Sequence, residues 1–315
     1  MKSKWLNVFL KISLSVIIVA GLYCWCCLIF LPKDLNDKGG VKYYDTIKID
    51  LEEKDSLDII MYGNSQIKAC VIPLKVYKQL GVTSYLNTNS YENLVTIYRE
   101  LKHDLKRQKP KVIILEVENV FDSNNLDSES WKYGSEFIAP YIYHTRWKEL
   151  EAKDFFTKPS SNKDAHKGFY FRTDVCEYNY KYHMSPTTAK RKVSKSSVNY
   201  LKKIKKICDK NNIKLFCFTA PCAASWNMRE HNGFMEVKDK LGLDYVDLNL
   251  ELTNFDYYHN FRDQGMHCNF DGANVVTDYL INYISEHFNM QDKRPDPKYK
   301  EWNDLVEKYD QFYKY

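Results

Sequence analysis

Short apolar runs alternate with longer amphipathic stretches along most of the chain between residues 56 and 295. Apolar runs of this length, bounded by glycine, proline or polar residues, predict buried β-strands. They cover residues 57–62, 82–86, 112–117, 214–219 and 245–248. Apolar residues at helical spacing between these runs predict helices. The predicted helices cover residues 72–80, 91–107, 194–211, 225–241 and 272–288.

The alternation of predicted strands and helices indicates the class of fold. Strands followed by helices of this length form right-handed βαβ units, which build a parallel sheet covered on both faces. We therefore predict an α/β fold: a three-layer sandwich with a central parallel sheet. In such sheets, ligands bind beyond the carboxyl ends of the strands.

Several stretches fall outside this alternation. Residues 120–193 are aromatic, polar and poorly periodic, and we interpret them as an insertion or lid. Residues 33–55 are polar and charged and predict a linker that precedes the domain. The predicted catalytic domain covers residues 56–295, which leaves residues 296–315 as a C-terminal tail.

An uncharged N-terminal stretch is long enough to cross a membrane as a helix. It runs for 20 residues from Ile12 to Leu31 and follows three lysines. A cleaved signal peptide is the competing interpretation, but bulky Tyr23 and Trp25 stand where a cleavage site needs small residues. We predict that residues 1–32 are a short cytoplasmic tail and one transmembrane helix. The domain is expected on the extracytoplasmic side of the cell membrane, although the lysines flanking the span are nearly balanced.

Charge and composition argue against several functions. The net charge of +5, from 46 basic and 41 acidic residues, gives no field that favours nucleic acid. Three of the nine cysteines lie in the apolar span, and the other six have no CxxC or His-rich spacing typical of a metal site, so we predict neither a metal nor a cofactor. The 25 Tyr, 16 Phe and 6 Trp suit a surface that binds sugars, or reflect a compositional bias.

Two polar segments lie at the ends of different predicted strands. Ser65 follows the first strand in MYGNSQ, where its hydroxyl and its backbone N–H point into the ligand crevice. Asp263 and His267 lie in the loop before the last helix, in DQGMHCNFDGA. A nucleophilic serine needs a base and a group that orients this base. A serine at such a turn is more often only a helix N-cap; the combination of the two segments predicts a catalytic triad.

These segments resemble the first and last sequence blocks of the SGNH (GDSL-like) hydrolase superfamily. More narrowly, the chain is similar to membrane-anchored proteins of bacterial cell-surface polysaccharide loci, distantly related to DltD and the alginate-acetylation proteins. That group also shows a YxxHxRWxEL-like stretch, which here is YIYHTRWKEL from Tyr141 to Leu150. The resemblance covers residues 55–288 and implies that Ser65 is the nucleophile, His267 the general base and acid, and Asp263 its orienting group.

The chain departs from the family pattern at the oxyanion site. The family's oxyanion glycine has no counterpart in SYLNTNSYENL. Besides the Ser65 backbone N–H, the side-chain amide of Asn87 or Asn89 is a candidate donor, and the sequence does not choose between them. Removing one such donor typically lowers the rate by about 10²–10³.

Four further residues have candidate functions. Glu116 ends a strand and either lines the crevice or caps a turn. Asp247 ends the last strand and is an alternative partner for the histidine. Arg146 and Trp147 offer a planar donor fork and a stacking face for a sugar or carboxylate, or they pack the core of the insertion.

The sequence therefore predicts a serine-dependent acyl-ester enzyme, either an O-acyltransferase or an esterase. Acetyl is the expected acyl group, and a cell-envelope or exported polysaccharide is the substrate implied by the resemblance. A membrane partner that supplies the acyl donor is compatible with this prediction. The alternative is a non-catalytic glycan-binding or assembly component with a degenerate SGNH fold.

Overall fold

The computed structural model describes residues 2–34, 37–38, 40, 43, 48–88, 92–122, 135–177 and 180–314. The chain forms two compact units. The anchor unit consists of residues 1–47 and 128–162, and the sheet unit consists of residues 48–127 and 163–315.

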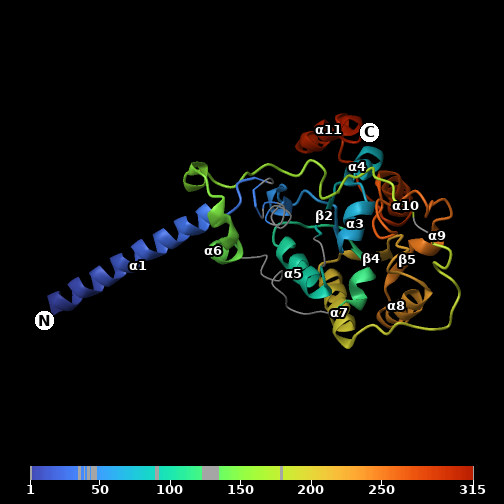
Figure 1. Ribbon diagram of the computed structural model, residues 1–315, viewed down its shortest axis with the longest axis horizontal. Helices are drawn as coiled ribbons and strands as arrows, with labels where there is room; N and C mark the ends of the chain where they lie inside the picture. Colours follow the sequence, from blue (N-terminus) through green and yellow to red (C-terminus); the bar gives the residue numbers. More distant parts are fainter. Residues whose placement is uncertain are drawn as a thin grey trace. The chain divides into compact units, whose positions relative to one another are not determined.

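The described part of the sheet unit contains one sheet of five parallel strands (Figure 1). Its order, β2-β1-β3-β4-β5, is the flavodoxin-like order. The strands are β1 (Ile59–Tyr62), β2 (Ser84–Leu86), β3 (Val112–Glu116), β4 (Lys214–Thr219) and β5 (Asp244–Asp247). Each lies within two residues of its predicted position, so the predicted α/β class and parallel sheet are confirmed.

The burial of each strand explains its place in the sheet. β1 and β3 are wholly buried apolar runs that pair with Ile59 opposite Val112 and Met61 opposite Ile114. The outer strand β5 is more polar and only partly buried. Strands covered on both faces need continuous apolar sequence, whereas edge strands do not.

Helices cover both faces of the sheet and give the predicted three layers (Figure 1). One layer contains α3 (Ser65–Cys70), α4 (Pro73–Leu80) and α10 (Phe270–His287). The other contains α5 (Leu94–Asp104), α7 (Lys195–Lys210) and α8 (Met228–Leu241). The first layer begins earlier than the helix predicted over residues 72–80, because α3 already starts at Ser65. Pro73 then starts α4, which corresponds to the predicted helix. The short helix α9 (Leu248–Glu251) directly follows β5.

The C-terminal segment that we predicted as a tail is packed into the sheet unit. It forms η7 (Pro297–Tyr299), α11 (Lys300–Glu307) and α12 (Tyr309–Phe312). Trp302 and Tyr313 are buried, and the Trp302 ring lies 5.1 Å from that of Tyr77 in α4. Aromatic residues spread over a short polar segment carry no clear periodicity, which is why the sequence pattern missed this packing.

The predicted linker and insertion are also divided differently in the structure. The short helix η1 (Lys48–Leu51) already belongs to the sheet unit, and Glu52 forms a buried ion pair with Lys167. The backbone carbonyl of Lys167 accepts a hydrogen bond from the N–H of Leu86 at the sheet edge. The described end of the predicted insertion, from residue 163, is therefore built into the sheet unit.

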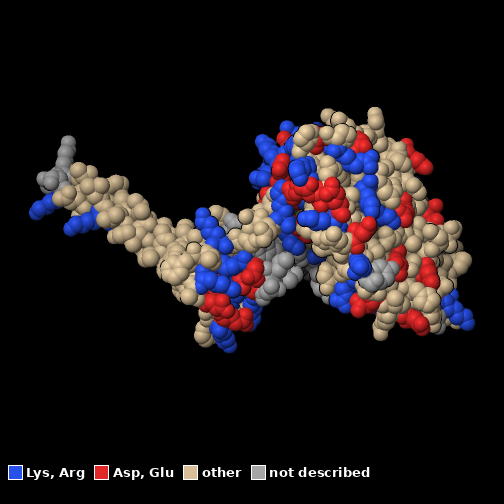
Figure 2. Space-filling model, turned by 90° about the horizontal axis from the view of Figure 1, so that it is seen from above, with Lys and Arg blue, Asp and Glu red and all other residues tan. Residues whose placement is uncertain are grey.

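The anchor unit is formed by α1 (Lys2–Phe30) and a segment that packs against its C-terminal end. We call residues 135–157 the collar; it contains η4 (Ser135–Ile138), α6 (Ala139–Ile142), η5 (His144–Lys148) and η6 (Ala152–Phe155). Within the described residues, α1 is the one helix that is long and apolar enough to cross a membrane. Figure 2 shows that its surface is uncharged along most of its length, with basic side chains near its start.

Candidate active site

Ser65 is the first residue of α3 and lies just beyond the carboxyl end of β1. Gly63 lies in the turn between them, where its backbone passes so close to Glu116 of β3 that a side chain would not fit. A Cβ atom at this position would lie 2.8 Å from the Cβ of Glu116. Asn64 caps the helix by accepting a hydrogen bond from the N–H of Gln66 at 2.9 Å. The turn therefore holds the Ser65 side chain at the ligand-binding edge of the sheet.

The structure brings Ser65, His267 and Asp263 together in one hydrogen-bonded chain. The Ser65 hydroxyl lies 2.7 Å from Nε2 of His267. The other ring nitrogen, Nδ1 of His267, lies 2.5 Å from Oδ2 of Asp263. Ser65 lies near the beginning of the sheet unit's sequence, and Asp263 and His267 lie near its end. The hydrogen-bonded chain has the order nucleophile, base and orienting carboxylate.

The loop that carries His267 is held closed by its own backbone. Phe261 and Cys268 form an antiparallel bridge, and the N–H of Arg262 donates to the carbonyl of His267 at 3.0 Å. Oδ1 of Asp263 accepts from the backbone N–H groups of Met266 and His267, at 3.1 and 2.8 Å. One carboxylate therefore fixes both the loop and the histidine ring.

The surroundings of Asp263 favour its ionised form. Burial alone would raise the pKa of this carboxyl. The hydrogen bonds from the His267 side chain and from the two backbone N–H groups outweigh burial and lower the pKa below its usual value. A carboxylate that stays charged keeps Nδ1 of His267 protonated, so that Nε2 can accept the proton of the serine.

A second set of polar contacts ties the Ser65 turn to the ends of β3 and β4. The Glu118 carboxylate accepts hydrogen bonds from the Asn64 side-chain amide and from the Ser225 hydroxyl, both at 2.7 Å. The Gln66 amide donates to Ser225 at 3.3 Å and to Cys222 at 3.1 Å. These bonds hold the residues on both sides of Ser65.

Glu118 and Ser225 are the site residues that sequence reasoning missed. Each follows the carboxyl end of a predicted strand, and that position was the available signal. We assigned a candidate role to Glu116 instead. Its side chain is fully buried and accepts a hydrogen bond from the Glu118 N–H at 3.0 Å, and burial raises its pKa well above the usual value. Glu116 therefore caps the turn, one of the two roles proposed for it.

The buried thiol beside the site is not an activated nucleophile. Burial raises the pKa of Cys222 to about 11, so the reactive thiolate is scarce near neutral pH. Within the described part of the chain, no group of three or more His, Cys, Asp or Glu side chains is placed to hold a metal ion.

The other candidates for oxyanion binding and for orienting the histidine have different contacts. Asn87 is buried, and its side-chain amide donates one N–H to the Asp104 carboxylate at 2.7 Å, which leaves the second N–H of this amide as the candidate oxyanion donor. This role stays a prediction. Asn89 lies outside the described residues. Asp247 accepts hydrogen bonds from Trp226 and from His231, at 2.9 and 2.8 Å, and not from His267.

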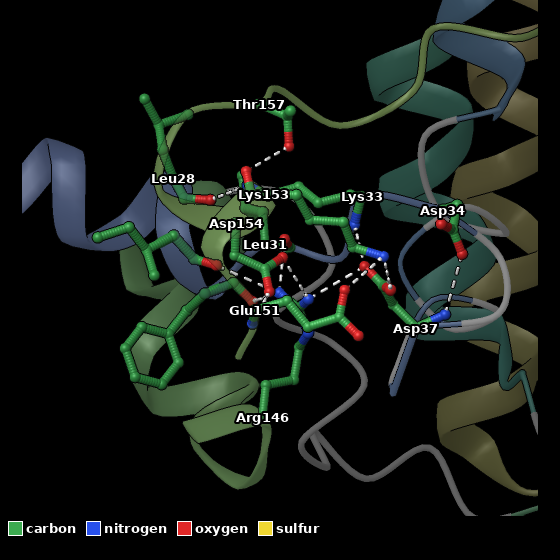
Figure 3. Close-up of polar contacts among 12 residues, drawn as sticks. Leu28, Leu31, Lys33, Asp34, Asp37, Arg146, Glu151, Lys153, Asp154 and Thr157 are labelled. Carbon is green, nitrogen blue, oxygen red and sulfur yellow. Dashed lines mark hydrogen bonds and ion pairs between the residues drawn. The ribbon is translucent and has the colours of Figure 1, made fainter. Parts of the chain in front are cut away.

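Arg146 and Trp147 belong to the anchor unit, in the helix η5. Nη1 of Arg146 donates to the carbonyls of Ile29, Phe30 and Leu31, at 3.2, 2.9 and 2.7 Å (Figure 3). Nη2 donates to Asp37 and Asp154. The guanidinium is buried and engaged at the end of α1, which corrects the substrate-binding role predicted for it.

Trp147 has a different environment from its neighbour Arg146. Its side chain is 62% exposed, and the Lys148 ammonium lies 5.4 Å from its ring centre. An exposed indole keeps a free stacking face. The contact with Lys148 does not test whether Trp147 binds a ligand, so its binding role stays a prediction.

Comparison with known proteins finds similar solved structures only. No family model matches the sequence, and no curated protein does. The chain is similar to an acetyl xylan esterase (14% identity, TM-score 0.38, 72% of this chain and 98% of the other). It is also similar to the esterase EstA from a Pseudoalteromonas species (12%, 0.38, 74% and 100%) and to a GDSL-like lipase from Bacteroides thetaiotaomicron (10%, 0.37, 78% and 97%). The structures that resemble this chain thus include GDSL-like (SGNH) hydrolases.

Proposed function

We propose that this protein is a serine-dependent acyl-ester enzyme of the SGNH kind. The observation that carries the proposal is the chain of hydrogen bonds from Ser65 through His267 to Asp263. Ser65 attacks the ester carbonyl and transfers its proton to His267, which then protonates the departing alcohol. Water or a sugar hydroxyl, activated by the same histidine, releases the acyl group from the serine.

The oxyanion of the tetrahedral intermediate needs hydrogen-bond donors close to Ser65. The backbone N–H of Ser65 is one candidate, because it lies at the start of α3 and no described residue accepts its hydrogen bond. A backbone donor of this kind is placed before the reaction begins. It therefore stabilises the developing charge without reorganisation.

A pocket next to the catalytic loop supports a glycan as the acyl carrier. The pocket has a volume of ≈ 470 Å³, and the exposed side chains of Tyr180, Tyr182 and Arg229 are among those that line it. Its wall is joined to the catalytic loop, because the N–H of Ala224 donates to the carbonyl of Gly265 at 3.0 Å. Ring faces and a guanidinium suit the apolar faces and hydroxyls of a sugar.

The proposed location is the extracytoplasmic face of the cell membrane, with α1 as a single-pass anchor. The support for the anchor is the length and apolar surface of α1. We propose that the polysaccharide substrate meets the enzyme there, and that a membrane partner supplies the acyl donor if the reaction is a transfer.

The direct test is covalent labelling of the serine. The full-length protein in detergent is treated with a fluorophosphonate, and its intact mass is compared with that of Ser65→Ala. We expect one adduct on the native chain and none on the variant, because only a serine activated by a base reacts. A folded native chain that stays unlabelled would contradict the proposal and favour a glycan-binding role.

The pocket gives a separate expectation about substrate preference. Tyr182→Ala is expected to lower kcat/KM for an acetylated oligosaccharide about tenfold, the effect of losing roughly 1.4 kcal/mol of stacking. Hydrolysis of p-nitrophenyl acetate should not change, because this ester has no sugar to stack. Tyr258→Ala, an exposed tyrosine outside the pocket, is the control. An equal effect of Tyr182→Ala on both substrates would exclude a sugar-binding role for the pocket.

A further inference from the structure

The collar exposes several large aromatic side chains. Phe137 is 71% exposed, Tyr141 81%, Trp147 62% and Phe156 87%. Aromatic side chains grouped on a surface mark a site of interaction with a protein, a ligand or a membrane. Trp and Tyr in particular are enriched where a membrane protein meets the boundary between the lipid tails and water.

The collar is directly joined to the helix that we propose as the membrane span. The Tyr23 hydroxyl donates to the carbonyl of Phe137 at 2.6 Å. The indole N–H of Trp25 donates to the carbonyl of Phe155 at 3.3 Å, and the two rings lie 6.1 Å apart. The exposed aromatic residues of the collar therefore lie beside the last turns of α1.

The length of α1 places the collar at the edge of a bilayer. Lys11 is the last charged residue before the apolar stretch, so it marks the near boundary of the lipid tails. From Ile12 to Tyr23, the first residue that bonds the collar, α1 rises about 17 Å, and from Ile12 to Leu31 the rise is about 29 Å. The hydrocarbon core is about 30 Å thick, so its far boundary falls near Leu31, which packs on the collar residues Ala139 and Tyr143.

The end of α1 has the hydrogen bonding expected where water is scarce. The last carbonyls of a helix have no partner within the helix. Here the carbonyl of Cys27 accepts from the Leu31 N–H, that of Leu28 from the Lys33 ammonium, and those of Ile29 and Phe30 from Arg146 (Figure 3). Protein donors thus replace water at every one of these groups, as a membrane requires. The cations also match the negative end of the helix dipole.

The charged groups of the collar fit the polar side of the same boundary. Lys38 pairs with Glu149 at 2.9 Å, and Lys153 pairs with Glu151 at 3.3 Å. Figure 2 shows charged side chains grouped on part of the anchor unit, with uncharged atoms next to them. Paired charges need no anionic lipid and are compatible with the head-group region of an ordinary bilayer.

We propose that the collar is a lipid-binding surface that inserts into the head-group boundary of the membrane. Phe137, Tyr141, Trp147 and Phe156 contact the upper part of the lipid chains. Arg146 fixes the collar to α1 and does not itself bind lipid. This inference rests on the proposed membrane anchoring by α1, and it is independent of the chemistry at Ser65.

Photocrosslinking to lipid tests the collar and the anchor separately. The photoreactive amino acid p-benzoylphenylalanine replaces Tyr141, Phe156, Val19 or Tyr182, one at a time, in the full-length chain. Val19 is exposed on α1 inside the proposed span, and Tyr182 is a similarly exposed aromatic residue of the sheet unit. Each protein is reconstituted into phosphatidylethanolamine and phosphatidylglycerol vesicles and irradiated, and the mass of a lipid adduct is sought. Near-ultraviolet circular dichroism confirms that each variant is folded.

We expect lipid adducts at positions 141, 156 and 19, and none at 182. An adduct at position 19 without adducts at 141 and 156 would overturn the collar proposal and leave the anchor intact. The absence of an adduct at position 19 would overturn the anchor and the collar together. Equal labelling at 182 would also overturn the collar proposal, because lipid contact would then not be specific to it.

Discussion

Replacing His267 with alanine is expected to lower kcat/KM for p-nitrophenyl acetate by roughly 10³–10⁶-fold. Without the imidazole, no described group lies within hydrogen-bond distance of the Ser65 hydroxyl to accept its proton. Removing the base from such a unit costs about as much as removing the serine itself. Initial rates of ester hydrolysis, together with the rate of fluorophosphonate labelling, measure the loss.

The chain contains a matched control for this variant. His259 forms a similar pair with Asp256, with 2.7 Å between Nδ1 and Oδ2, but its side chain is 58% exposed and, within the described residues, its ring has no hydrogen bond to a serine hydroxyl. His259→Ala should therefore leave both rates unchanged. If the two histidine variants behave alike, or if His267→Ala keeps the native rate, His267 is not the base.

Asp263→Asn is expected to lower kcat by about 10⁴-fold while the fold is retained. The asparagine oxygen can still accept the backbone hydrogen bonds of Met266 and His267. Its NH₂ group then faces Nδ1 of His267, which must act as an acceptor. The proton of the imidazole moves to Nε2, and a protonated Nε2 cannot take the proton of Ser65.

Steady-state kinetics with Asp256→Asn as the control measure this effect. The same experiment with Asp247→Asn tests the alternative partner considered from the sequence. Because Asp247 bonds Trp226 and His231, we expect its variant to lose stability more than it loses turnover per folded molecule. A native rate for Asp263→Asn together with an inactive but folded Asp247→Asn would reverse the assignment.

The sheet and the Ser65–His267–Asp263 chain could be predicted because both depend on local patterns. Continuous apolar runs such as IIMY and VIILE are typical of strands buried on both faces. The parallel order then brings the ends of these strands to one edge. A serine after the first strand and a histidine before the last helix meet there without knowledge of any other contact.

The partners of Arg146 at the end of α1 and the packing of the C-terminal segment could not be predicted in this way. Both depend on contacts between residues far apart in the sequence. Arg146 bonds carbonyls more than a hundred residues away, and Trp302 packs on Tyr77. Asn87 shows the same limit, since only the structure reveals that its amide is held by Asp104. Side-chain partners of this kind leave no periodic signal.

The division of the chain into units has a practical meaning for production of a soluble enzyme. The polypeptide passes between the anchor unit and the sheet unit three times, near residues 47, 127 and 162. Deleting only the N-terminal helix would therefore leave the collar attached and would uncover Ala139 and Tyr143, which are buried against Cys27 and Leu31. A water-soluble form should remove both pieces of the anchor unit, residues 1–47 and 128–162. By the same connectivity, one cut near residue 47 would leave the sheet unit joined to the collar, so it would not separate the sheet unit from the whole of the anchor unit.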